Sequence, residues 1–188
     1  MIIDRMQTYS KSELNLVHDA SMDILENIGI GFHHSDAIEL FRKNGFRINN
    51  FRVFFSEKDV VQALETAPER FRIHSRNPMR SVGIGGDNYV LLPTGGAPNI
   101  AKPDGQQRPA TLSDFQTCCK LVQTSTQLDM TDSLMVQPND LPPLVAHLDL
   151  LFNTIVMCDK PFLVGFDSRN SVDHAIAMAR ILSGGSYD

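Results

Sequence analysis

The chain has 188 residues, of which 42% are hydrophobic, and its formal net charge is −5 at pH 7. This length suits one domain or one and a half, and the acidic balance argues against nucleic acid as a partner. The sequence has no run of about 18 apolar residues, and its three cysteines do not make a disulfide framework. Because its first residues lack a long apolar segment, we expect no signal peptide. We therefore expect a cytoplasmic protein with no membrane span.

The sequence pattern of residues 1–88 predicts a helical cap with a small β-ribbon. A first helix follows Ser10, which with Glu13 has the spacing of a capping box, and this helix should end at Gly29. Ser35 is expected to cap a second helix, and Ser56 a third. The β-ribbon is expected over residues 71–74 and 81–84, which alternate as strands do.

The sequence pattern of residues 89–188 predicts three β-α units in succession. The expected strands are 89–92, 128–136 and 161–166, and the expected helices are 111–122, 144–155 and 172–182. Such alternation favours a parallel sheet. Right-handed crossovers place the C-terminal ends of parallel strands on one side, so residues 95–99, 137–140 and 165–168 should line one face.

The segment from Tyr89 to Asp114 organises this second part. It predicts a strand, a glycine turn at Gly95-Gly96, a polar loop, and a helix that begins at Thr111. Ligands of parallel α/β folds gather where strands lead into helices. A tight turn without a ligand explains the two glycines as well.

Three strands are too few for a closed barrel, which needs eight strands and typically about 250 residues. A three-stranded parallel sheet leaves two open edges and poorly covered faces. We therefore expect the opening part of a longer protein, and we expect it to self-associate through the open sheet edges.

Four segments in the same order carry a family resemblance. They are HDASMDILENIGIGF (residues 18–32), PTGGAPNIAKPDGQQRPATLSDF (93–115), QPNDLPP (137–143) and CDKPFLVG (158–165). Together they resemble the trimethylamine methyltransferase family. The resemblance implies the N-terminal part of a TIM-type (β/α)8 barrel. It also implies transfer of a methyl group from trimethylamine or another quaternary amine to a corrinoid on a partner protein.

Family chains are longer, and the later barrel strands and the pyrrolysine position of some members lie beyond the matching region. No catalytic residue is therefore assigned, no cofactor is expected to bind this chain directly, and the chain alone is predicted to be inactive. A non-catalytic fragment and an α/β ligand-binding module remain alternatives.

A quaternary ammonium is held by aromatic faces and by carboxylates at a distance. Such groups occur on the face that residues 95–99, 137–140 and 165–168 should line, which we call the rim. Each also has a simpler alternative: Phe166 as a core residue, Asp167 as a helix cap, Asp140 as a turn residue and Asn99 as a residue that closes its own loop. The predicted substrate-binding set is Gly95, Gly96, Asn99, Gln137, Asp140, Phe166 and Asp167.

Several other residues are predicted to have structural roles. His33-His34 is interpreted as a surface pair and not as a metal site, and no metal site is expected elsewhere. One of Cys118 and Cys119 should pack in the core. Arg108 is interpreted as a solvated loop residue, and residues 81–86 lack the Lys-Ser/Thr of a P-loop.

Overall fold

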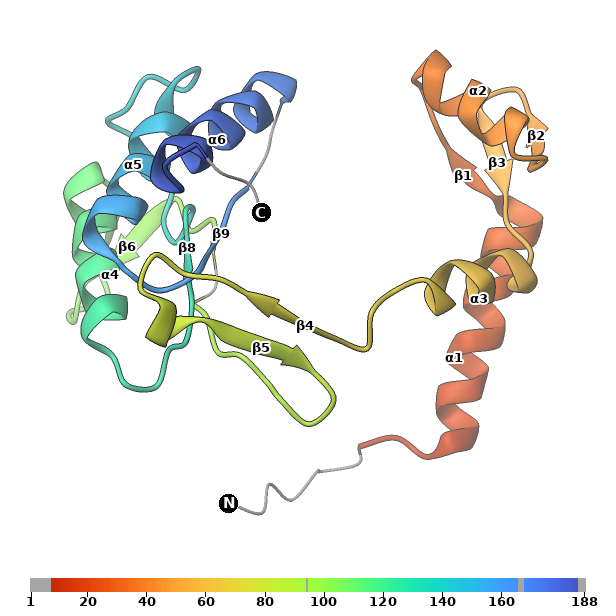
Figure 1. Ribbon diagram of the computed structural model, residues 1–188, viewed down its shortest axis with the longest axis horizontal. Helices are drawn as coiled ribbons and strands as arrows, with labels where there is room; N and C mark the ends of the chain where they lie inside the picture. Colours follow the sequence, from red (N-terminus) through yellow and green to blue (C-terminus); the bar gives the residue numbers. More distant parts are fainter. Residues whose placement is uncertain (1–7, 94, 166–167, 186–188) are drawn as a thin grey trace. The chain divides into compact units, whose positions relative to one another are not determined.

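The computed structural model describes residues 8–93, 95–165 and 168–185. It contains helices and small sheets, none of which closes on itself (Figure 1), and the mixed α/β class is confirmed at that level. Contacts within the chain define two compact units, residues 1–68 and residues 69–188.

The first unit opens with the predicted capped helix. In α1 (Lys11–Asp23) the Ser10 hydroxyl accepts the Glu13 N–H, and the Glu13 carboxylate accepts the Ser10 N–H at 2.8 Å. A π-helical turn, η1 (Ile24–Ile28), continues α1 and ends at Gly29, whose φ is 72°. A Cβ at that glycine would lie 2.7 Å from the Val53 carbonyl oxygen, so both the turn and the packing require glycine.

Three short strands form an antiparallel sheet in the order β1-β3-β2, with bounds β1 (Ile30–Gly31), β2 (Arg47–Asn49) and β3 (Arg52–Phe54). Helix α2 (Ser35–Lys43) lies between β1 and β2, and α3 (Glu57–Glu65) follows β3. The capping box at Ser56 is confirmed, whereas the prediction that Ser35 caps α2 is wrong by one residue. His34 is the cap, because its ring nitrogen Nδ1 accepts the Asp36 N–H.

The second unit begins with the predicted β-ribbon. Strands β4 (Arg70–Ile73) and β5 (Val82–Gly85) pair antiparallel, with Ile73 opposite Val82. The connection contains a 3-10 turn, η2 (Pro78–Arg80), which the Asn77 side chain caps. Residues 81–86 are therefore largely strand and turn.

A second hairpin lies in the segment that we expected to be a polar loop. Strands β6 (Asn99–Ala101) and β7 (Gln107–Pro109) pair antiparallel, and α4 (Leu112–Thr124) follows with Thr111 as its N-cap. Residues 89–92 form no strand. The Leu91 N–H donates instead to the Asp129 carboxylate at 2.9 Å. The Leu91 carbonyl accepts the N–H groups of Asp129 and Met130.

The parallel pairing between the second and third predicted strands is confirmed. Strands β8 (Thr131–Asp132) and β9 (Phe162–Leu163) are shorter than predicted and pair in parallel, with Thr131 opposite Phe162. Helix α5 (Ala146–Met157) connects them, and α6 (Arg169–Leu182) follows β9. A parallel bridge between Ala97 and Val136 adds the segment before β6 to this arrangement.

The core of the second unit lies around α4. Phe115 and Cys119 are fully buried, and Val122 is nearly so, on one face of this helix. They pack with Leu150 of α5 and with Met135. The prediction that one of the adjacent cysteines enters the core is confirmed.

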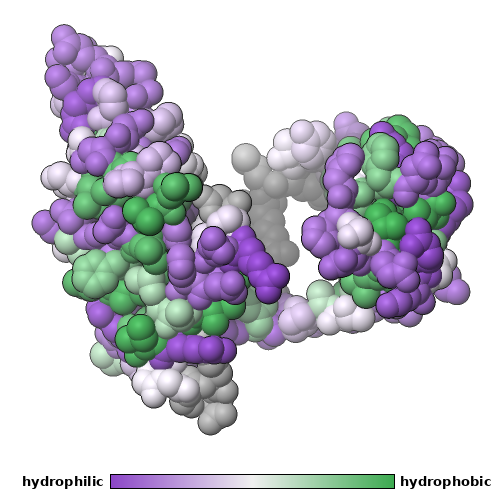
Figure 2. Space-filling view, turned by 90° about the horizontal axis from the view of Figure 1, so that it is seen from above, coloured by the Kyte–Doolittle hydropathy of each residue, from purple (hydrophilic) through white to green (hydrophobic). Residues whose placement is uncertain are grey.

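Hydrophobic side chains are also exposed on both units, and they appear as green surface between hydrophilic residues (Figure 2). Within the described ranges, no helix is both long enough and apolar enough to cross a membrane.

Candidate functional site

The glycine turn before β6 lies against the segment that follows β8. The Gly96 N–H donates to the Leu134 carbonyl at 2.6 Å. A Cβ at Gly95 would lie 2.9 Å from that carbonyl oxygen and 3.1 Å from the Asp132 carboxylate, whereas Gly96 has open space but a φ of 86°. Both glycines are thus explained by backbone geometry, close approach for Gly95 and a left-handed turn for Gly96.

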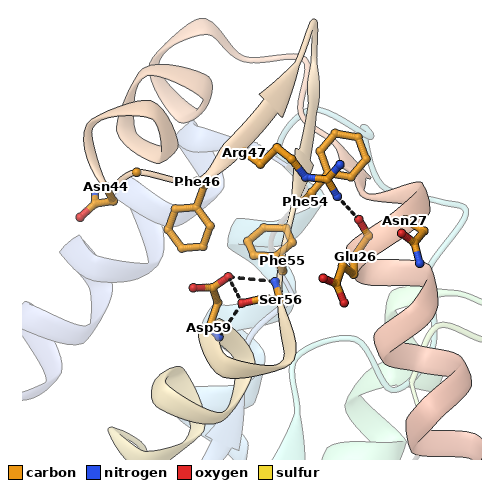
Figure 3. A pocket seen from close by; sticks show the side chains of 10 residues that line it. Glu26, Asn27, Asn44, Phe46, Arg47, Phe54, Phe55, Ser56 and Asp59 are labelled. Atoms are coloured by element: carbon orange, nitrogen blue, oxygen red, sulfur yellow. Dashed lines mark hydrogen bonds between the residues drawn. The ribbon is translucent and has the colours of Figure 1, made fainter.

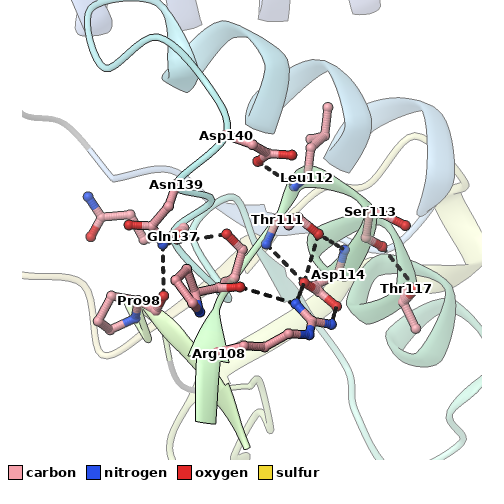
Figure 4. A network of polar contacts seen from close by, with 12 residues as sticks. Pro98, Arg108, Thr111, Leu112, Ser113, Asp114, Thr117, Gln137, Asn139 and Asp140 are labelled. Atoms are coloured by element: carbon pink, nitrogen blue, oxygen red, sulfur yellow. Dashed lines mark hydrogen bonds and ion pairs between the residues drawn. The ribbon is translucent and has the colours of Figure 1, made fainter.

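The segment after β8 continues this contact. The Gln137 N–H donates to the Ala97 carbonyl at 2.9 Å, and the Asn139 N–H donates to the Ala110 carbonyl at 2.8 Å. The Asn139 side chain donates to the Pro98 carbonyl at 2.8 Å (Figure 4). Asn139 therefore joins both ends of the β6-β7 hairpin to the rim, a role that we did not predict for it because its partners lie 29 and 41 residues away in sequence.

Asp140 has a structural role at the start of α4. Its Oδ1 atom accepts the Leu112 N–H at 2.9 Å, which satisfies one of the unpaired donors at the N-terminus of that helix (Figure 4). A carboxylate at this position also interacts favourably with the helix dipole. This contact with the start of α4 was not among the roles that we predicted for Asp140, and its substrate role stays a prediction.

The same helix start contains an ion pair that the sequence interpretation missed. Arg108 donates to the two Asp114 carboxylate oxygens at 2.6 and 2.7 Å, so it is not simply a solvated loop residue. Asp114 also accepts from the Thr111 N–H and hydroxyl. The hydrogen bonds from Arg108, followed by those from Thr111, hold the pKa of Asp114 far below its ordinary value despite the opposing effect of burial.

A cavity of about 490 Å³ lies where β8 and β9 end, beside α5 and α6. Its polar lining includes Ser133, Gln137, Asn139 and His147, and its apolar lining includes Leu134 and Leu150. The Ser133 hydroxyl also accepts the Gly165 N–H at 3.4 Å, so the ends of the two parallel strands meet at this cavity. Small-molecule sites usually combine apolar walls with a few convergent polar groups, and this cavity has both kinds of lining.

Among the predicted substrate-binding residues, only Gln137 lines this cavity within the described part of the chain. Asn99 lies at the start of β6 and is exposed. Phe166 and Asp167 lie outside the described residues. Ser168, the next residue, caps α6 through a reciprocal arrangement with Ser171.

His147 is a cavity residue that the sequence analysis did not single out. Its Nε2 atom lies 2.9 Å from Nδ1 of His174 in α6, and the two rings are nearly parallel, at 8°. The sequence gives no signal for this pair, because 27 residues separate its members. Across the described ranges, no group of three or more His, Cys, Asp or Glu side chains could hold a metal ion.

The fold is of the mixed α/β class, and a cavity lies where two parallel strands end. The family model described as Trimethylamine methyltransferase (MTTB) matches residues 2–188, and the chain belongs to that family.

The chain is also similar to several curated proteins. The chain is 34% identical over 184 residues to "Glycine betaine methyltransferase" of Desulfitobacterium hafniense (strain Y51), covering 98% of this chain and 38% of the relative. It is 27% identical to "L-carnitine:corrinoid methyltransferase" of Eubacterium limosum, covering 76% of this chain and 29% of the relative. It is 30% identical to "Proline betaine:corrinoid methyltransferase" of the same organism, covering 80% and 30%. The chain thus spans about a third of these relatives.

Proposed function

We propose that this chain is the N-terminal portion of a methyltransferase that moves a methyl group from a quaternary amine to a corrinoid on a partner protein, and that the chain alone is inactive. The family match over residues 2–188 carries the proposal. The share of the relatives that the chain spans, 29 to 38%, supports the inactivity of the chain alone.

The proposed fold is the first part of a TIM-type (β/α)8 barrel, with residues 1–88 as a cap and residues 89–188 as its first three β-α units. Two observations support it. Strands β8 and β9 are parallel and joined by a helix, and the bridge from Ala97 to Val136 is also parallel. Active sites of such barrels lie at the C-terminal ends of the strands, which is where the cavity lies.

The proposed chemistry is a displacement at a methyl carbon. The bond from carbon to nitrogen breaks, and the nitrogen keeps the electron pair and leaves as a tertiary amine. A reduced corrinoid on the partner would accept the methyl group and would supply the electron pair for the new bond to carbon. The work of the methyltransferase is then to hold the amine and the corrinoid in line.

The residues proposed to contact substrate are Gly95, Gly96, Asn99, Gln137, Asp140, Phe166 and Asp167. The position of Gln137 in the cavity supports its inclusion. The Asp140 carboxylate also accepts the Leu112 N–H, so we propose that it positions the start of α4 in addition to contacting substrate. We further propose a cytoplasmic location and a homo-oligomeric state.

A chimera tests the proposal. Residues 1–188 would replace the matching part of the Desulfitobacterium glycine betaine methyltransferase, and demethylation of glycine betaine, carnitine, proline betaine and trimethylamine would be followed with a reduced corrinoid protein. We expect turnover by the chimera with at least one amine and no turnover by the 188-residue chain. Turnover by the chain alone would contradict its inactivity. A folded chimera that is inactive on all four amines, beside an active unaltered relative, would contradict the proposed reaction.

A further inference from the structure

A second cavity lies within the first unit, apart from the candidate site. Its volume is about 450 Å³, and it is a half-open hollow lined by residues of η1, the connection from α2 to β2, the end of β3 and the start of α3 (Figure 3). A volume of this order accommodates a small organic ligand.

One side of this cavity is aromatic. Phe46, Phe54 and Phe55 all line it, and all three are only partly buried. The Phe46 and Phe55 rings are 5.3 Å apart between centroids and inclined at 60°, so they form a corner and not a flat stack. Aromatic faces attract quaternary ammonium groups, which cannot donate hydrogen bonds.

Two carboxylates add negative charge to the same cavity. Asp59 is fixed in place because its Oδ2 atom accepts the Ser56 N–H at 2.8 Å and the Ser56 hydroxyl at 2.6 Å. These hydrogen bonds lower its pKa, so it is ionised at neutral pH. Glu26 lies on the η1 side of the cavity (Figure 3). The carboxylates and the aromatic corner together suit a cation.

Arg47 gives the cavity a positive end. Its guanidinium lies over the Phe54 ring, 4.0 Å from the centroid, and donates to the Glu26 carbonyl oxygen (Figure 3). These two contacts fix the plane of the guanidinium. An arginine has five N–H donors in a rigid fork that matches a carboxylate, so the contact with Glu26 leaves donors for a ligand.

We propose that this cavity binds a betaine, a small zwitterion with a quaternary ammonium at one end and a carboxylate at the other. The ammonium lies against Phe46 and Phe55, near the Glu26 and Asp59 carboxylates, and the ligand carboxylate is received by Arg47. The ligand class rests on the proposed function. The site is one of binding and lies in a different unit from the rim proposed for methyl transfer.

Binding to the 188-residue chain would be measured by isothermal titration calorimetry with three ligands. Glycine betaine has both charges, choline has no carboxylate, and 3,3-dimethylbutyrate has a neutral carbon in place of the ammonium nitrogen. We expect glycine betaine to bind at least tenfold more tightly than either of the other two. Arg47→Met should weaken glycine betaine binding at least tenfold and leave choline binding within threefold, and Phe46→Leu should weaken both.

The chain offers a matched control for the arginine variant. Arg52 also lies over a phenylalanine, Phe51, at 5.8 Å, and it donates to the carbonyls of Ile28 and Gly29, yet it does not line the cavity. Arg52→Met should therefore leave glycine betaine affinity unchanged. If Arg47→Met does not fold, as judged by circular dichroism, Arg47→Lys keeps the charge but removes the fork, and it should still weaken glycine betaine binding.

Three results would overturn the inference. One is an absence of glycine betaine binding to the folded chain. Another is a glycine betaine affinity that is the same in the Arg47 and Phe46 variants as in the parent chain. The third is binding of 3,3-dimethylbutyrate as tightly as glycine betaine. Affinity lost only in Gln137→Ala would place the ligand at the strand ends and leave the proposed function standing. The chimera's methyl transfer tests that function independently.

Discussion

Lys160 is a buried cation with a full set of acceptors. Its side chain is 3% exposed, and its Nζ atom donates to the carbonyls of Val122, Ser125 and Leu128 at 2.6 to 2.7 Å. Burial lowers its pKa, whereas carbonyls at the C-terminal end of α4 favour the ammonium form. The residue therefore fastens the end of α4 to the segment before β9.

Replacing this lysine should be costly. Lys160→Met keeps the length of the side chain but leaves three carbonyls without their donor, and we expect a loss of about 3 kcal/mol or more in the free energy of unfolding. Urea denaturation would measure it. Lys120→Met, on the exposed side of α4, is the control and should change stability by less than about 0.5 kcal/mol. Equal effects from both variants would contradict the role given to Lys160.

Asp114 should make stability depend on pH. Because its pKa is lowered in the folded state, its contribution is complete above the unfolded value, about pH 4, and is lost as the pH falls toward the folded pKa. Asp114→Asn should therefore be less stable than the parent at pH 7, by about 1 kcal/mol, and the difference should shrink below about pH 4. Urea titrations at several pH values would test this, with Asp19→Asn as a surface control. A difference that stays constant with pH would contradict it.

The three cysteines should differ in reactivity. Burial raises the pKa of Cys119 to about 12, with further contributions from the neighbouring thiols of Cys158 and Cys118, and its side chain is fully buried. Cys118 is only partly buried. Since the thiolate is the nucleophile, iodoacetamide should modify Cys118 first in the native chain and reach Cys119 and Cys158 only in denaturant. Mass spectrometry would locate the label, and early labelling of Cys119 would refute the expectation.

At the scale of elements, the glycine turn fixes how the β6-β7 hairpin meets the end of β8. Gly95→Ala introduces a methyl group 2.9 Å from the Leu134 carbonyl, so the turn must move and the hydrogen bond between Gly96 and Leu134 should weaken. Gly165→Ala is a matched control, because its Cβ meets Leu134 at an ordinary 3.8 Å. We expect faster amide hydrogen exchange at Gly96 in the first variant only. Equal exchange rates in both variants would contradict this account.

Elements defined by neighbours in sequence could be predicted, and those defined by distant partners could not. The caps at Ser10, Ser56 and Thr111 depend on residues three positions away, and all three are confirmed. Residues 89–92 have the composition of a strand, but their contacts to Asp129 and Met130 satisfy Leu91 without a ladder. The hairpin β6-β7 was missed because its strands are short and polar, and β7 ends in a proline.

The candidate site shows the same limit. Its position at the ends of the second and third strands follows from β-α alternation. Gln137 lines the cavity there, and its role in binding substrate stays a prediction. The contacts of Asn139 and the pairing of His147 with His174 depend on tertiary structure, for which spacing in sequence gives no information. The roles of Phe166 and Asp167 stay predictions.

At the scale of the whole molecule, the second unit has an incompletely covered surface. Phe152 and Val156 lie one turn apart on α5 and are 56% and 54% exposed, and Leu163 in β9 is 45% exposed. Among the described residues, the sheet to which β9 belongs consists of β8 and β9. Exposed apolar surface and the edges of a small sheet both favour association.

We therefore expect the chain to self-associate at micromolar concentration. Phe152→Lys and Val156→Lys together should shift it toward monomer in light scattering. Leu144→Lys, at a 90% exposed position in the connection before α5, should not. A parent chain that is monomeric throughout the concentration range would count against this expectation.

The hydrogen bonds of Lys160 also impose an order of events during synthesis. The carbonyl groups at the C-terminal end of α4 are synthesised well before the ammonium group that donates to them, because Lys160 follows Ser125 by 35 residues. Helix α5 is completed in that interval, and the pairing of β8 with β9 becomes possible only two or three residues after Lys160. In a nascent chain that ends before Lys160, the last carbonyl groups of α4 would be hydrogen-bonded to water. A translational pause in this interval would therefore leave the second unit without the hydrogen bonds that join α4 to the segment before β9.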